Sequence, residues 1–480
     1  MNLLFDLRVL SLLIALITGF EIFPLLLALY LGEDPMALIQ SIAVSSVAVV
    51  IGLVVTRNAR PELSPRDGFL ITSLGWFLAA FFGGLPYVFH PEGLDWSSAF
   101  FETASGFTTT GSSAMTDIEV WPQGILLWRS TTQWLGGMGM ILMAIAILPF
   151  LGVGGTQLMK AEVPGPTKDR MTPRLASTAR ALWGVYTLIT VVGMIGYWLC
   201  GMTWLDAVNH AFTAIATGGF STKNMSLGHY SDAAQWWAIL IMGMGGMNFL
   251  IHYRVIVFRD WKAFTYEELI GYLVIIGLVT AFLVAKLIGW NPIWSLEDVV
   301  RHSLFQVVSV MTTTGFASTD WELWPPVTQL MLGLVMVVGG MSGSTGGGIK
   351  VIRVLVLLKT IPSVTMRLLQ PNQVVVPKID HQPIPREILE NAVALFILAM
   401  GYVLFGGILL NALGLDLLSA MGASLTAWAN VGPGFNTVGA MDNFAHVPAF
   451  GKIILASMMI VGRLEIFTIL MLFSHRFWRH

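Results

Sequence analysis

Long apolar runs separated by short polar segments recur along the whole chain. The first two, at 9–31 and 36–55, flank a short acidic turn. Each has about the 20 residues that a membrane-spanning helix needs. From Gly68 onward the pattern predicts four outer helices, near 68–89, 180–201, 269–289 and 388–413. It also predicts four inner helices, near 124–151, 235–258, 325–358 and 451–474. The hydrophobic pattern therefore predicts ten membrane spans.

A shorter segment, rich in hydroxyl residues, lies between each outer helix and the inner helix that follows it. Aligned without gaps, the four segments end at Gly111, Gly219, Gly315 and Gly432, and they cover residues 98–111, 206–219, 302–315 and 419–432. Small or hydroxyl residues recur twelve, six and two positions before each glycine. Such segments are too short to cross a bilayer of about 30 Å. We predict four re-entrant half-helices, each followed by an extended loop that faces a water-filled cavity.

The residues before each aligned glycine suit the binding of a dehydrated cation. Successive backbone carbonyls can turn inward there and replace water around the ion, because glycine does not resist the turn. Ordinary turns are the alternative, but they do not explain four copies in one register. The fourth copy also allows a second register, on Gly434. The predicted cation-binding residues are Thr109, Thr110, Gly111, Thr217, Gly218, Gly219, Thr313, Thr314, Gly315, Asn430, Val431 and Gly432.

The composition excludes a soluble globular protein. Hydrophobic residues make up 55% of the chain, charged residues 11%, and the mean hydropathy is +0.74. These values are typical of a polytopic membrane protein. The net charge of −2 indicates no particular partner, and nucleic acid is not among those we expect. Cys200 is the single cysteine, and the nine histidines lack the spacing of metal ligands, so we predict neither a disulfide nor a metal cofactor.

The charged residues predict an orientation in the membrane. If both termini lie in the cytoplasm, the outer side holds few of the 26 Lys and Arg residues, namely Arg129, Lys223, Lys286, Arg301 and Lys452. This distribution follows the positive-inside rule. The outer segments then carry an acidic excess that would concentrate cations at a pore mouth. Solubility alone is the alternative explanation for any one of these carboxylates.

The inner helices carry a second repeat. Gly-Gly-Met occurs at 136–138, 245–247 and 339–341, and glycine pairs allow helices to approach closely or to bend. At the matching place in the fourth unit, Arg463 follows Gly462. A charge at mid-membrane costs roughly 2.5–3.5 kcal/mol on insertion scales, so it indicates a function or a buried partner. A salt bridge with Glu465 and snorkelling to the membrane surface are the structural alternatives.

The third inner helix is interrupted by a glycine-rich run. It does not fit a nucleotide-binding P-loop, because Lys350 comes one residue late, no Ser or Thr follows it, and no strand precedes it. We predict instead that the run unwinds the helix below the four loops, where its carbonyls and hydroxyls face the arginine of the fourth unit. The predicted gate residues are Gly343, Ser344, Thr345, Gly346, Gly347, Gly348, Lys350 and Arg463.

These motifs together resemble a known family. The four loop copies, GSTGGGIKVIR at 343–353, VGRLEIFTIL at 461–470 and AEVPGPTKDRMTPRLASTARALW at 161–183 are similar to the TrkH-type membrane subunit of bacterial potassium uptake systems, within the Trk/Ktr/HKT superfamily. The resemblance covers essentially the whole chain. Two departures concern the loops themselves, since Asn-Val-Gly-Pro-Gly replaces Thr-Thr-Gly-Phe in the fourth copy and Gly218 replaces a larger residue in the second.

The resemblance implies an all-α polytopic membrane protein resembling potassium channels, with two N-terminal helices and four helix–pore loop–helix repeats around a central pore. The implied units are an accessory helix pair at 1–67 and pore repeats at 68–155, 156–262, 263–370 and 371–480. It also implies a homodimer in the bacterial inner membrane, with K⁺ as the transported ion. A cytosolic TrkA-type ring would bind nucleotides and control opening. Basic residues suited to an acidic ring are Lys160, Lys168, Arg170, Arg174, Arg180 and those within 254–262, for which anchoring by the positive-inside rule is the alternative.

Two other classes of protein must be weighed. A proton- or sodium-coupled symporter would also show repeats and broken helices, but it usually carries an intramembrane carboxylate as its coupling site. Glu21 and Glu465 are the candidates for that role. An intramembrane enzyme would need a catalytic dyad or a metal cluster among its helices, and the sequence offers neither. The sequence therefore predicts a transport protein and leaves coupled transport as the alternative to a channel-like pore.

Overall fold

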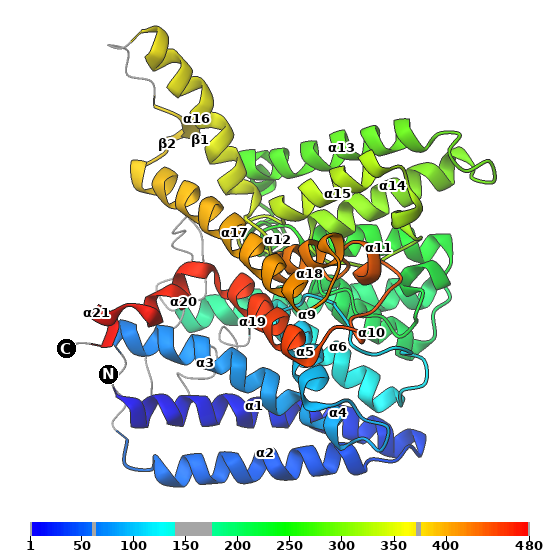
Figure 1. Ribbon diagram of the computed structural model, residues 1–480, viewed down its shortest axis with the longest axis vertical. Helices are drawn as coiled ribbons and strands as arrows, with labels where there is room; N and C mark the ends of the chain where they lie inside the picture. The colour runs from blue at the N-terminus through cyan, green and yellow to red at the C-terminus, as the bar shows by residue number, and fades with distance from the viewer. Residues whose placement is uncertain (1, 60–63, 140–174, 371–375, 479–480) are drawn as a thin grey trace.

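The computed structural model describes residues 2–59, 64–139, 175–370 and 376–478 (Figure 1). Within them the chain is almost entirely helical, and its two short strands, β1 (Lys378–Ile379) and β2 (Gln382–Pro383), form one antiparallel hairpin. Six of the described helices are long and apolar enough to cross a membrane on their own, by length and composition. The predicted all-α polytopic membrane fold is confirmed.

The two N-terminal helices form a pair at one edge of the molecule. α1 (Leu3–Leu31) packs between α2 (Met36–Val55) and α3 (Pro65–Gly83), as Figure 1 shows. Close approach is possible because Gly52 of α2 lies directly against Ser11 of α1. The buried carboxylate of Glu21 accepts a hydrogen bond from the Ser41 hydroxyl at 2.9 Å. This hydrogen bond joins the two helices through buried polar groups.

The outer helices begin and end within about five residues of the predicted bounds. The first consists of α3 and α4 (Leu85–Phe89), and the others are α9 (Leu175–Leu199), α13 (Glu267–Leu287) and α17 (Arg386–Ala412). α3 begins with a capping box between Ser64 and Asp67, which satisfies the first free amides of the helix. Each outer helix packs against the short helix of its own repeat.

Four half-helices occupy the middle of the molecule. They are α5 (Trp96–Phe107), α10 (Trp204–Ile215), α14 (Leu296–Met311) and α18 (Leu417–Ala429). Each begins at a side-chain cap, Asp95, Thr203, Ser295 or Asp416, and ends just before the aligned glycine of its repeat. At 1.5 Å per residue even the 16-residue α14 is shorter than the bilayer core. These helices are therefore too short to cross a bilayer.

The inner helices are broken, and here two predictions were wrong. The continuous helix expected at 235–258 is α11 (Asp232–Gly245) and α12 (Phe249–Phe258), bent by 95°, because Asn248 starts a new helix by capping Leu250. The helix expected at 451–474 is α19 (Ala449–Leu464) and α20 (Ile466–Phe473), bent by 107° at Glu465, whose φ is 59°. Both breaks come from local backbone conformation rather than from a loss of hydrophobicity.

The first and third inner helices differ from these two. The first is α6 (Gln123–Gly137); residues 140–151 of the expected helix lie outside the described residues. The third consists of α15 (Pro326–Val338) and α16 (Val351–Leu369), joined by the interruption that the sequence predicted. The remaining described elements are η2 (Ser226–His229), η3 (Trp261–Thr265), η4 (Trp321–Leu323), η5 (Asn436–Val438) and α21 (His475–Trp478).

Half-helices and inner helices alternate around a closed ring. α6 packs against α5 and α10, α11 against α10 and α14, α15 against α14 and α18, and α19 against α18 and α5. Every inner helix therefore lies between its own half-helix and that of the next repeat. The ring closes because the fourth inner helix reaches back to the first half-helix.

Candidate functional site

The four aligned glycines lie in loops of one backbone conformation. We call the segments 108–114, 216–222, 312–318 and 430–435 the glycine loops. In each, the residue two before the glycine has a left-handed φ, between 52° and 61°, at Thr109, Thr217, Thr313 and Asn430. The glycines have φ between 79° and 105°, at Gly111, Gly219, Gly315 and Gly432. The fourth loop therefore repeats the conformation at Gly432 rather than at Gly434.

The glycine loops meet backbone to backbone around a common centre. A Cβ atom added to any of the four glycines would come closer than 3.0 Å to a carbonyl oxygen of the next loop. That oxygen always belongs to the residue before the neighbouring glycine. Gly111 faces Gly218, Gly219 faces Thr314, Gly315 faces Val431 and Gly432 faces Thr110. The order runs through all four repeats and returns to the first, so only glycine fits at these positions.

Asn430 and Ser112 join the first and fourth loops. The Asn430 side chain donates to the Thr110 hydroxyl and to the Met459 carbonyl, both at 2.9 Å. The Ser112 hydroxyl donates to the Gly432 carbonyl at 2.9 Å. Thus the unusual fourth sequence, Asn in place of Thr, adds a contact between neighbouring loops.

The glycine pairs of the inner helices explain how each helix fits between two half-helices. In the first and second inner helices the first glycine of the pair lies against its own half-helix: Gly245, for example, would place a Cβ 2.8 Å from the Ile215 carbonyl oxygen. The second glycine of these two pairs lies against the next repeat, since a Cβ on Gly137 would lie 2.8 Å from Cα of Ala216. Close approach on both sides requires residues without side chains.

The break in the third inner helix is wider than predicted and contacts three of the glycine loops or their half-helices. We call residues 339–350 the intramembrane loop; left-handed φ values occur at Gly339, Gly343, Gly348 and Lys350. The Thr345 hydroxyl donates to the carbonyls of Ile215 and Gly245, both at 3.0 Å. The Gly347 amide donates to the Thr313 hydroxyl at 2.7 Å, and Gly347 also lies against the Ala429 carbonyl. The loop therefore lies where the half-helices end.

Arg463 binds this loop and the first inner helix at once. Its guanidinium donates to the carbonyl oxygen of Thr345 at 2.5 Å and to those of Gly136 and Gly137 at 2.8 and 3.1 Å. Glu465, an alternative partner in the sequence, accepts two hydrogen bonds from Arg353 of α16, at 2.6 and 2.9 Å. Backbone carbonyl oxygens thus accept hydrogen bonds from the guanidinium, whose charge would otherwise be costly in the membrane.

The loop's own side chains bond within the protein. The Ser344 hydroxyl donates to the Met341 carbonyl at 2.6 Å, and Lys350 Nζ donates to the Gly346 carbonyl. The predicted gate residues are therefore brought together with Arg463, although the Ser344 and Thr345 hydroxyls bond to backbone carbonyls.

Three basic residues assigned to the outer side are buried within the helices. Arg129 forms a 2.6 Å ion pair with Glu102, Arg301 pairs with Asp298 at 2.5 Å, and Lys452 donates to Ser98 at 2.8 Å. Each is at most 6% exposed. A count of charges along the sequence could not show that these three have buried partners.

Sequence reasoning missed two side chains at the second glycine loop. Gln133 and Arg129, both on α6, bond to the backbone of Gly218, Phe220 and Ser221. Aligning the inner helices on their glycine pairs gives the signal, because Gln133 stands where the other three helices have methionine.

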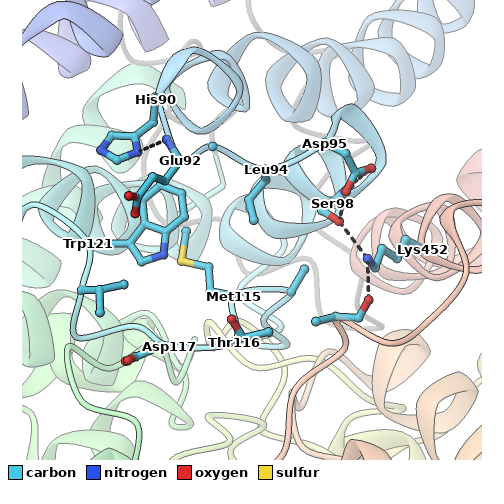
Figure 2. A pocket seen from close by; sticks show the side chains of 14 residues that line it. His90, Glu92, Leu94, Asp95, Ser98, Met115, Thr116, Asp117, Trp121 and Lys452 are labelled. Atoms are coloured by element: carbon cyan, nitrogen blue, oxygen red, sulfur yellow. Dashed lines mark hydrogen bonds between the residues drawn. The ribbon is translucent and has the colours of Figure 1, made fainter.

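A cavity of about 390 Å³ lies beside the start of α5, in the first repeat (Figure 2). Its lining includes His90, Glu92, Asp95, Asp117 and Lys452. Burial opposes the ionisation of Asp95, but hydrogen bonds from Ser97 and Ser98 lower its pKa to about 2. A negative charge therefore remains at the start of this half-helix, where the helix dipole also favours it.

Residues 36–479 match the model of the family TrkH, described as a cation transport protein. The chain belongs to the TrkH family. It is 36% identical over 500 residues to the Trk system potassium uptake protein TrkH of Halomonas elongata, covering 100% of both chains. It is 38% identical over 483 residues to the Trk system potassium uptake protein TrkH of Escherichia coli strain K12, covering 98% of each.

A solved structure of the family has the same fold. The crystal structure of the potassium transporter TrkH from Vibrio parahaemolyticus matches with a TM-score of 0.88 and 33% identity, covering 100% of both chains. The family resemblance seen in the sequence is confirmed. The prediction of a multi-pass transport protein rather than an enzyme is likewise confirmed by the family.

Proposed function

We propose that this protein takes up K⁺ across the bacterial inner membrane through a channel-like pore at the centre of the four repeats. The observation that carries the proposal is the closed ring of glycine loops, in which each glycine lies against a carbonyl of the next repeat. Rings of backbone carbonyls replace the hydration shell of K⁺ in known selectivity filters. The family and the names of its relatives agree with this ion.

The ion is coordinated by the residues around the four glycines. Their backbone carbonyls and hydroxyls supply neutral oxygen ligands, which suit a monovalent cation. The half-helices end just before these loops, so the negative ends of their dipoles add attraction for a cation. The proposed filter residues are Thr109, Thr110, Gly111, Thr217, Gly218, Gly219, Thr313, Thr314, Gly315, Asn430, Val431 and Gly432.

The intramembrane loop closes the pathway below this filter. Its contacts with Thr313, Ile215 and Ala429 support a position across the ion path. The guanidinium of Arg463 adds a positive charge in a low-dielectric passage, which repels cations. Opening then requires α16 to move and to draw the loop aside. The proposed gate residues are Gly343, Ser344, Thr345, Gly346, Gly347, Gly348, Lys350 and Arg463.

A cytosolic partner drives this movement. We expect a homodimer whose cytoplasmic face binds a TrkA-type ring, with nucleotides bound by the ring rather than by this chain. Both termini lie on the side toward which α16 and its hairpin project in Figure 1, which supports a common cytoplasmic side. Of the basic residues proposed for ring binding, Lys160, Lys168, Arg170 and Arg174 lie outside the described residues.

Flux in liposomes that contain no other protein tests the transport mode. We expect passive, saturating K⁺ flux down its own gradient, carried by the purified protein alone. A strict requirement for a proton or sodium gradient would contradict the channel-like pore and favour a coupled symporter. Empty liposomes serve as the control for leak, and liposomes containing the Gly315→Ser variant, which we expect to lose K⁺ selectivity, show whether the flux passes through the proposed filter.

A further inference from the structure

The second glycine loop is held by two side chains of the preceding inner helix. Gln133 donates to the Gly218 carbonyl at 2.6 Å and accepts from the Phe220 amide at 3.0 Å. One helical turn earlier, Arg129 donates to the Ser221 carbonyl at 2.9 Å. Its guanidinium carbon lies 3.5 Å from the centre of the Phe220 ring, a cation–π contact. Both sides of Gly219 are therefore bound to α6.

The other inner helices have no equivalent of this arrangement in sequence. Aligned on the first glycine of each pair, the position of Gln133 holds Met242, Met336 or Met459. The position of Arg129 holds Ala238, Leu332 or Leu455. A polar pair at these two positions is thus a property of the first inner helix.

The second glycine loop also differs from the others at the residue just before its aligned glycine. It is Thr110, Thr314 or Val431 in three loops and Gly218 in the second. Gly218 has no left-handed φ, so its backbone conformation alone would accept a side chain. The obstacle is Gln133: a Cβ added to Gly218 would overlap the side-chain amide, lying within 3.0 Å of its Cδ, Oε1 and Nε2. The amide therefore fills the space that a side chain at 218 would need.

A buried ion pair fixes the arginine of this arrangement. Arg129 Nε lies 2.6 Å from a Glu102 oxygen, and the side chains are 3% and 0% exposed. Glu102 also accepts from the Ala114 amide at 2.7 Å and from the Ser113 hydroxyl at 3.1 Å. The charges are paired and further hydrogen-bonded, as a buried pair must be to persist. The pair links the first glycine loop to the second.

We propose that Gln133 is a positioning residue that sets ion selectivity by holding the Gly218 carbonyl. That carbonyl lies against Gly111, at the contact between the first and second glycine loops. The Gln133 amide holds it from the other side with a 2.6 Å hydrogen bond. Arg129 anchors the same loop farther along. The inference rests on the proposed filter function, and it assigns a part in selectivity to a residue that lies outside the filter.

Replacing Gln133 with the residue used elsewhere in the chain tests the proposal. In Gln133→Met, we expect the K⁺:Na⁺ flux ratio in liposomes to fall by about tenfold, because a buried carbonyl and a buried amide both lose their partner. Gln133→Glu keeps the shape and the acceptor for Phe220 but removes the donor to Gly218. We expect the same direction of change in this second variant, which separates the donor from packing.

A compensating change provides the sharper test. In Gly218→Thr alone, the added side chain collides with Gln133, and we expect the K⁺:Na⁺ flux ratio to fall below that of Gln133→Met. The double variant Gln133→Met/Gly218→Thr reproduces the Met and Thr pair of other repeats, and we expect it to recover at least part of the ratio. Met336→Leu is the matched control on α15 and is expected to leave the ratio unchanged.

The outcomes separate this proposal from the one on which it rests. If Gln133→Met and Gln133→Glu elute like the wild type and keep its flux ratio, while Gly219→Ser loses it, Gln133 is only a packing residue. If Gly219→Ser also keeps the wild-type ratio, the filter assignment fails and the role of Gln133 fails with it. Failure of the double variant to recover any selectivity overturns the pairing of Gln133 with Gly218.

Discussion

Alanine at each filter glycine should lower K⁺ selectivity in a graded order. The added Cβ comes within 3.0 Å of a neighbouring carbonyl oxygen in all four variants. At Gly432 the separation is 2.7 Å, so an adjustment of about 0.7 Å restores ordinary contact. At Gly111, Gly219 and Gly315 the overlap is deeper. These three variants must displace the neighbouring loop by about 1.2–1.5 Å, and a misplacement of about 1 Å is already enough to spoil the geometry of a rigid site.

Backbone strain and steric overlap both lower the selectivity of these alanine variants. The steric overlap decides which variants lose most. Left-handed backbone costs a residue other than glycine about 1–2 kcal/mol, which corresponds to roughly 5- to 30-fold in an equilibrium. This cost is similar in all four variants because all four φ values lie between 79° and 105°. The displacement of the neighbouring loop by more than about 1 Å adds a further loss of up to about 100-fold. We therefore expect about a 100-fold fall in the K⁺:Na⁺ flux ratio for Gly111→Ala, Gly219→Ala and Gly315→Ala, and about tenfold for Gly432→Ala.

Competitive flux in liposomes measures this order directly. Rubidium or potassium uptake is compared with sodium uptake at equal concentrations, in protein that elutes as the wild type does. Gly277→Ala is the matched control, because no atom lies within 4 Å of the added Cβ and the residue sits inside α13. An unchanged ratio in all four variants, or a larger loss at Gly432 than at the other three, would refute the assignment of carbonyl contacts to the filter.

Three further predictions concern the proposed gate, the ion pair between Arg353 and Glu465, and the carboxylate of Glu322. Arg463→Ala, or deletion within 343–348, should raise K⁺ flux severalfold without the partner; flux that stays closed in both would leave Arg463 a structural charge. Arg353→Met should lower the unfolding free energy by about 1.5–3 kcal/mol and favour opening, because Glu465 loses both its hydrogen bonds from Arg353; unchanged melting and flux would contradict this. Burial raises the pKa of Glu322 to about 7, so its ionisation opposes folding and stability falls as pH rises from 4.5 to 7; in Glu322→Gln this fall in melting temperature should be smaller.

The sequence predicted the helices well wherever hydrophobicity alone defines them. The second helix occupies 36–55 as expected, and α13 begins two residues before its predicted start. The breaks at 246–248 and at Glu465 were not predicted, because apolar residues continue on both sides of each break. Residues 466–473 of α20, for example, contain one hydroxyl and no charge. A hydropathy pattern measures the length of an apolar segment but not the direction of its axis.

Part of the candidate site could likewise be predicted from the sequence, and part of it could not. The register of the four glycines could be predicted, because a left-handed backbone facing a neighbour's carbonyl leaves glycine as the only fit, and that requirement repeats in sequence. The partners of the buried charges could not be predicted from the sequence. Arg463 binds carbonyls of Gly136 and Gly137, more than 300 residues earlier, and backbone carbonyls leave no pattern in a sequence. Gln133 was missed for the same reason, since Gly218 offers no side chain to suggest a partner.

The departures from fourfold repetition have a common physical basis. The loop at 339–350 contacts elements of the second, third and fourth repeats at once, so four symmetric copies of it would compete for the same places. Four guanidinium groups close together in a low-dielectric interior would likewise repel one another strongly. Joining the repeats in one chain removes that constraint, because each repeat can differ. The third supplies the loop and the fourth supplies Arg463 in place of a second glycine. The first supplies the carbonyls of Gly136 and Gly137 that hold Arg463, and, one turn away, the amide that holds the second glycine loop.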